Sequence, residues 1–162
     1  MGRRNPGTGD EIRMPPQTEK SLRNRAIDAL ARREHSRHEL ARKLALYAEN
    51  PDQLNDLLDD LQARGWLSDA RYAAQMANAR QNRYGSRKIA FELREKGVDE
   101  SLINAALDSL QGTELERARA IWRKKFGQAP ASEQEKAKQI RFLQSRGFGW
   151  EVIGRVLKLA DD

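Results

Sequence analysis

The chain has no cysteine among its 162 residues, so disulfides, thiolate metal sites and cysteine nucleophiles are excluded. Aromatic residues make up only 6% of it and hydrophobic residues 38%, which predicts a thin apolar core. No apolar run follows Arg3 and Arg4, and none approaches the roughly 18 residues of a membrane-spanning helix. We therefore expect a cytoplasmic protein that does not associate with membranes.

Residue groups that could perform catalysis or hold a cofactor are also missing. The two histidines, His35 and His38, have no third metal ligand beside them. The glycines within residues 147–154 match neither a phosphate-binding loop nor a dinucleotide-binding motif. Asp59 and Asp60 lack the apolar surroundings that would separate two carboxyl pKa values. We therefore expect no enzyme activity, no metal and no cofactor.

What the sequence does contain is a helical pattern with start and stop signals. Three pairs have the spacing of a capping box: Ser36 with Glu39, Thr113 with Glu116, and Ser132 with Glu135. Glycines that could end helices follow at Gly65, Gly97, Gly112, Gly127 and Gly147. The fold is therefore predicted to be all-α, with about nine helices at residues 20–34, 37–48, 51–64, 69–83, 86–96, 99–110, 113–126, 132–146 and 149–160.

The apolar pattern occurs three times along the chain. Residues Leu40, Leu44 and Leu58 recur 49 positions later as Ile89, Leu93 and Leu107. A third copy follows at an offset of 50, where Leu93, Gly97 and Ile103 recur as Leu143, Gly147 and Ile153. We predict a flexible tail at residues 1–17 and three tandem three-helix repeats at 18–68, 69–112 and 113–162. Neighbouring repeats are expected to share a core and to stack into an elongated, curved rod.

Charge changes sign within each repeat, although the whole chain carries +6. The net charge is +4 over residues 1–49, −4 over 50–70, +5 over 71–98, −5 over 99–116 and +6 over 117–162. Stacked repeats would align these blocks into one basic and one acidic surface. The candidate phosphate contacts lie near the start of each second helix: Arg32, Arg33, Arg37, Arg80, Arg83, Arg87, Lys88, Lys124, Lys125, Lys136 and Lys138.

Four segments resemble the RecX family of bacterial regulatory proteins. RYGSRKIAFELREKGV at 83–98 is similar to the family's central signature, and SRHEL at 36–40 to its first-repeat signature. LQARGWLSDARYA at 61–73 resembles the inter-repeat junction, and RFLQSRGF at 141–148 the third-repeat motif. The segments occur in the family's order, and the resemblance spans the chain from about residue 20. In one departure, Tyr47 and Ala48 stand where many relatives carry Lys and Gly.

The resemblance implies three three-helix repeats that lodge in the groove of the RecA filament and suppress its ATPase, strand-exchange and co-protease activities. Such a protein would modulate DNA recombination, DNA repair and the SOS response as a monomer. It would bind single- and double-stranded DNA weakly and non-specifically through the basic surface. Residues Gly85, Gly97 and Leu93 of the central signature are predicted to be turn and core residues, and thus poor choices for contact residues.

Two alternatives remain open at this point. Residues 141–157 have the order of a helix-turn-helix, which would suit a DNA-binding transcriptional repressor. The second helix of that motif carries Val152 and Ile153 at positions that look buried, which argues against its entry into a major groove. The other alternative is a scaffold whose concave repeat surface binds a peptide or protein without nucleic acid.

Overall fold

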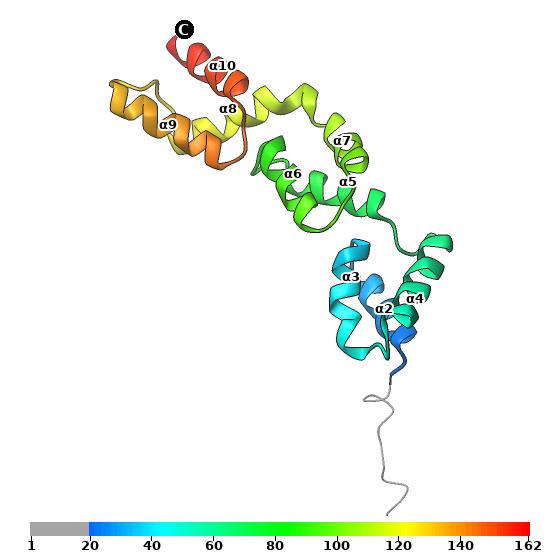
Figure 1. Cartoon of the computed structure of the whole chain (residues 1–162). Helices are drawn as coiled ribbons and strands as arrows, with labels where there is room; N and C mark the ends of the chain where they lie inside the picture. Colours follow the sequence, from blue (N-terminus) through cyan, green and yellow to red (C-terminus); the bar gives the residue numbers. More distant parts are fainter. Residues whose placement is uncertain (1–19) are drawn as a thin grey trace, which may run out of the picture.

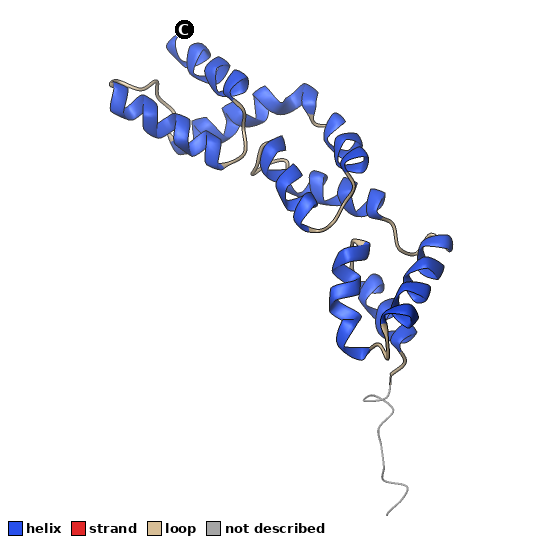
Figure 2. Cartoon of the chain, in the orientation of Figure 1, coloured by secondary structure: helices blue, strands red, loops and turns tan. Residues whose placement is uncertain are grey.

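The computed structural model describes residues 20–162, so the tail predicted at residues 1–17 lies outside the described residues. The described residues form nine α-helices and no strand (Figures 1 and 2), which confirms the all-α repeat fold. The helices are α2 (Leu22–Arg32), α3 (Arg37–Leu44), α4 (Pro51–Ala63), α5 (Asp69–Arg80), α6 (Ser86–Glu95), α7 (Glu100–Asp108), α8 (Glu114–Lys125), α9 (Glu133–Ser145) and α10 (Trp150–Asp161). Two short 3₁₀ turns, η1 (Ala45–Tyr47) and η2 (Gln111–Thr113), follow α3 and α7.

Two of the three predicted capping boxes supply a helix cap. The Ser36 hydroxyl accepts a hydrogen bond from the Glu39 amide, and the Glu39 carboxylate accepts one from the Ser36 amide. The Ser132 hydroxyl likewise accepts from the Glu135 amide and caps α9. The Glu135 carboxylate, however, accepts from the Ala131 amide and not from that of Ser132. The expectation for Thr113 was wrong. The chain runs from η2 directly into α8, so Thr113 is not extended, and its hydroxyl donates to the Leu110 carbonyl instead.

Four of the five glycines that were predicted to end helices have the backbone conformation of a helix end. Gly65, Gly97, Gly127 and Gly147 all have positive φ, between 71° and 95°. Gly112 does not belong to this group, because it lies inside η2.

The apolar core consists of three separate clusters. Helices α2–α4 enclose one cluster around Leu40 and Leu58, and α5–α7 enclose a second around Ile89 and Leu93. Helices α8–α10 enclose the third, which includes Phe148. The expected shared core was therefore wrong. Helix ends and turns meet between neighbouring units, and these carry backbone amides and carbonyls that need polar partners.

The three units follow one another from α2 to α10 and give the molecule its elongated form (Figure 1). We call the units repeat 1 (α2–α4), repeat 2 (α5–α7) and repeat 3 (α8–α10). No helix among residues 20–162 is both long enough and apolar enough to cross a membrane. No group of three or more His, Asp or Glu residues in the same range could hold a metal ion.

Candidate nucleic-acid interface

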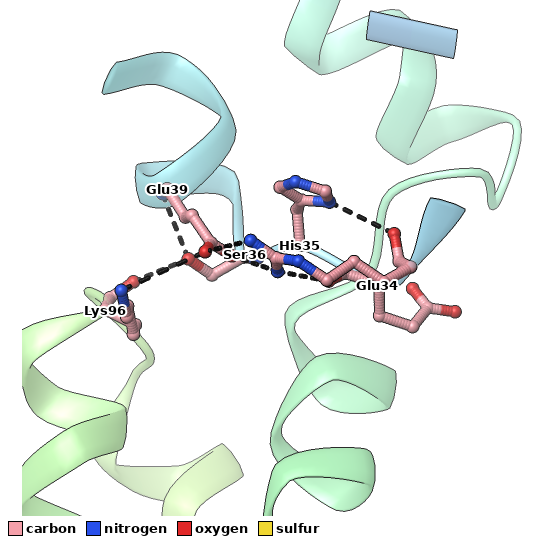
Figure 3. A network of polar contacts seen from close by, with 6 residues as sticks. Glu34, His35, Ser36, Glu39 and Lys96 are labelled. Carbon is pink, nitrogen blue, oxygen red and sulfur yellow. Dashed lines mark hydrogen bonds and ion pairs between the residues drawn. The ribbon is translucent and has the colours of Figure 1, made fainter. Parts of the chain in front are cut away.

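Two joints connect the repeats, and both use the same elements. At the first joint, the start of α3 in repeat 1 meets the turn between α6 and α7 in repeat 2. The Ser36 hydroxyl donates to the Lys96 carbonyl at 2.8 Å (Figure 3). The Arg37 amide donates to the Asp69 carboxylate at 2.7 Å. The first joint thus pairs a side-chain hydroxyl and a free amide of a helix start with polar groups of the next repeat.

The second joint repeats this arrangement between α6 and the turn that joins α9 to α10. The amides of Gly85 and Arg87 donate to the carbonyls of Arg146 and Gly147 at 2.7 and 3.0 Å. Glu114, in the first turn of α8, accepts from the Ser86 amide at 2.9 Å, as Asp69 of α5 does at the first joint. Both joints therefore pair the start of a second helix with a turn carbonyl and an acidic side chain of the next repeat.

Buried Arg117 adds a further connection at the second joint. Its guanidinium donates to the Gln81 and Tyr84 carbonyls of repeat 2 at 2.8 and 2.9 Å. Burial lowers the pKa of Arg117. The equivalent residue, measured from the helix starts at Asp69 and Glu114, is Tyr72, which has no guanidinium. At the first joint, the neighbouring Arg71 guanidinium donates instead to the Glu34 side chain of repeat 1 at 2.8 Å, so among the described residues only the second joint has a buried guanidinium bond to backbone carbonyls.

Each joint depends on a glycine turn with no room for a side chain. A Cβ added at Gly97 would lie 2.6 Å from the Cβ of His38. A Cβ added at Gly147 would lie 2.6 Å from the Lys88 amide nitrogen. The signature glycines thus permit close approach between repeats as well as left-handed turns. Repeat 1 has no such turn, since Ala48 is extended with φ −85°.

Opposite charges meet at the first joint. The Glu39 carboxylate lies 2.7 Å from the Arg33 guanidinium and 3.9 Å from Lys96 Nζ (Figure 3). Although burial alone would raise it, the pKa of Glu39 is lowered overall, because Arg33 donates hydrogen bonds to the carboxylate. The charges of the first joint are therefore largely neutralised.

Like charges meet at the second joint. Lys88 stands at the repeat position of Glu39, and Arg146 at that of Lys96. Both cations lie over the ring of Tyr84, with Lys88 Nζ 4.9 Å and Arg146 Cζ 5.6 Å from its centroid. Within residues 20–162, neither makes an ion pair with a carboxylate. The second joint thus holds two cations that have no carboxylate as ion-pair partner within residues 20–162.

These cations border a concavity of about 720 Å³, which we call the junction pocket. Its lining comprises Asn82, Arg83, Tyr84, Lys88, Ile121, Lys124, Lys125, Phe142, Ser145 and Arg146. The lining has five cationic side chains, two aromatic rings and no carboxylate. Arg146 also lies 5.1 Å from the centroid of the Phe142 ring, and Lys125 lies 5.6 Å from it. Such a combination suits a phosphate with an adjoining planar group.

Four of the eleven predicted contact residues line the junction pocket: Arg83, Lys88, Lys124 and Lys125. Three others are held in ion pairs, namely Arg33 with Glu39, Arg37 with Asp59, and Arg80 with Glu92. Arg32 borders a separate basic hollow on repeat 1, and Arg87 lies against Gly149. Lys136 and Lys138 border two other hollows on repeat 3. The unpaired cations thus gather most densely at the second joint.

Tyr84, Phe142 and Arg146 also line the pocket, although none of the three is among the contact residues predicted from the sequence. Tyr84 belongs to the central signature, of which only cations were predicted as contact residues, and Phe142 and Arg146 belong to the third-repeat motif. One signal was available, because aligning the repeats puts Lys88 and Arg146 where Glu39 and Lys96 stand one repeat earlier.

Comparisons with known proteins agree over most of the chain. Residues 68–107 match the family model described as RecX, second three-helix domain, and residues 113–157 match the third three-helix domain. The regulatory protein RecX of Leptothrix cholodnii is 54% identical, over 87% of this chain and 90% of that protein. The one from Chromobacterium violaceum is 49% identical, over 85% and 90%. The fold is similar to the crystal structure of RecX from Lactobacillus salivarius, with a TM-score of 0.76 and 20% identity over 86% of this chain and 94% of that one.

Proposed function

Because the chain belongs to the RecX family of regulatory proteins, we propose that it binds the RecA filament on DNA and inhibits RecA's ATPase, strand-exchange and co-protease activities. In this proposal it acts in the cytoplasm as a monomer, without catalysis, and regulates DNA recombination, DNA repair and the SOS response. The observation that carries the nucleic-acid part is the junction pocket, where cations converge without a carboxylate.

The charges support weak DNA binding that does not depend on sequence. Lys88, Lys125 and Arg146 can contact phosphates, and phosphate contacts position a protein on DNA without distinguishing its bases. Because such binding releases counterions, the affinity should fall steeply as salt rises.

The acidic helices support contact with protein. The third helices of repeats 1 and 2, α4 and α7, lie in segments that carry −4 and −5. In α4, Asp52, Asp56 and Asp59 are exposed. Such a surface would be repelled by DNA and attracted to a basic groove of a protein filament.

The repressor alternative has less support. The turn between α9 and α10 is already engaged, since the Gly147 carbonyl accepts from Arg87. The helix that would read the bases, α10, buries Ile153, Val156 and Leu157 in the core of repeat 3. Base reading in the major groove needs polar side chains on a free helix face.

The test is to add the protein to RecA that hydrolyses ATP on single-stranded DNA. We expect inhibition below one protein per RecA subunit. A double variant, Lys88→Glu with Lys125→Glu, should inhibit less than the matched control Arg155→Glu with Lys158→Glu, which changes two exposed cations of α10 outside the pocket. If the unmodified protein leaves ATP hydrolysis unchanged and instead binds one duplex sequence selectively, the repressor alternative replaces this proposal.

A further inference from the structure

We propose that the junction pocket holds a nucleotide of a single strand, with the phosphate between Lys88 and Arg146 and the base stacked beside Phe142. This inference rests on the proposed function only in that the pocket meets nucleic acid. It goes further by assigning the preferred form of the ligand, a strand whose bases are unstacked, and the side chains that distinguish it from a duplex.

The two joints provide an internal comparison. Both use amides at the start of a second helix, carbonyls or a carboxylate of the next repeat, and a close glycine turn. The first joint forms with Glu39 and Glu92 at the positions that Lys88 and Phe142 occupy in the second. A joint therefore forms without a lysine at the position of Lys88 and without a ring at that of Phe142, whereas the Arg146 guanidinium also donates to the Arg83 carbonyl across the second joint.

The cations at the second joint favour the binding of an anion. Lys88 and Arg146 lie over the same tyrosine ring, and Lys125 lies over Phe142 with no carboxylate in the lining. Like charges gathered around one concavity repel one another. A phosphate bound among them would replace the repulsion with charge-assisted hydrogen bonds.

The rings distinguish a nucleotide from an isolated phosphate. Phe142 is half-buried, packs perpendicular to the ring of Phe126, and also lines the pocket beside Arg146. Unstacked bases pack on aromatic rings and on guanidinium planes, whereas a duplex keeps its base faces covered. The volume of about 720 Å³ accommodates a group of this size.

The experiment compares three probes by fluorescence anisotropy: an oligothymidylate, an abasic oligomer of the same length and backbone, and a duplex. The unmodified protein should bind the oligothymidylate about tenfold more tightly than the abasic oligomer, since one stacked base contributes on this order. In Phe142→Leu this difference should disappear while affinity for the abasic oligomer is retained. The matched control Phe91→Leu changes a 59% exposed ring of α6 outside the pocket and should behave as the unmodified protein does.

A second pair of variants tests the phosphate contact without touching the core. Lys88→Gln with Lys125→Gln should weaken binding to all three probes and reduce the salt slope by about 0.7 per lost contact. The control is Arg155→Gln with Lys158→Gln. Because these changes lie outside the apolar cluster, they test the phosphate contact even if Phe142→Leu fails to fold, and the comparison of normal and abasic oligomers on the unmodified protein then tests the base.

Three results would overturn the inference: equal affinity for the normal and abasic oligomers, binding unaffected in the lysine pair, or RecA inhibition lost in that pair while oligonucleotide binding persists. The last result would assign the pocket to an acidic protein segment. The proposed function fails separately, if the protein binds the oligothymidylate through this pocket yet leaves RecA's ATPase unchanged.

Discussion

At the scale of single residues, Gly65 and Gly147 share a left-handed backbone but differ in their surroundings. A Cβ at Gly65 would meet nothing within 4 Å, whereas one at Gly147 would overlap Lys88. We expect Gly65→Ala to lower the free energy of unfolding by about 1 kcal/mol, the strain of left-handed alanine. Gly147→Ala should lower it further, because the second joint must also open. Urea denaturation measures both, and equal losses would contradict the role given to the joint.

His35 makes the stability of the protein depend on pH. The side chain is buried at the first joint, where Nδ1 donates to the Arg33 carbonyl and Nε2 has no partner. Burial lowers the pKa of His35 below its usual range. As pH falls below about 6.5, the unfolded chain therefore takes up a proton that the folded chain does not, and stability decreases.

Thermal unfolding at pH values between about 7 and 5 measures this effect, a window above the range in which carboxylates titrate. The decrease in Tm should be smaller in His35→Gln than in the unmodified protein. His38→Gln, which changes an exposed imidazole nearby, should retain the full decrease. An identical pH profile in all three proteins would exclude His35 as its source.

At the scale of elements, α6 separates core from surface within two residues. Leu93 is completely buried, whereas Phe91 is 59% exposed. Leu93→Ala should lower the free energy of unfolding by about 2 to 5 kcal/mol, since it leaves a cavity in the second cluster. Phe91→Ala should change it by less than about 0.5 kcal/mol. Denaturant titration of the two variants measures both losses. Similar losses would contradict the assignment of Leu93 to the core and Phe91 to the surface.

The elements were predictable because their signals are local. Ser36 and Ser132 cap helices in the structure as their sequence positions indicate, and the helix boundaries agree within about one turn. The prediction that Thr113 caps a helix was wrong, because a capping residue needs an extended backbone and η2 continues directly into α8. A sequence pattern identifies a capping side chain but not the backbone angles that allow it to act.

The pocket could be predicted only in part, since it depends on contacts across long stretches of chain. Lys88 and Lys125 could be predicted as contact residues because positive charge is dense around them in the sequence. Arg146 did not, because its position beside Tyr84 arises from the second joint, where a turn 60 residues further along docks on the start of α6. The expected shared core also failed, as periodicity shows which residues are buried but not which helices enclose them together.

At the scale of the whole molecule, three cores and polar joints should make the repeats respond separately. In repeat proteins, stability is a sum of repeat and neighbour terms. Leu40→Ala removes a fully buried side chain from the first cluster. We expect faster amide hydrogen exchange in α2–α4 and little change in α8–α10, as measured by mass spectrometry of peptides. Uniform acceleration along the chain would show instead that the repeats open as one unit.

The joints also give the array a direction, because each needs a helix start on one side and a glycine turn on the other. Repeat 1 does not offer that turn, since Ala48 is extended and follows Tyr47, and Leu46 is 92% exposed. A protein engineer who grafts another unit ahead of α2 would therefore have to install Lys and Gly at positions 47 and 48 first.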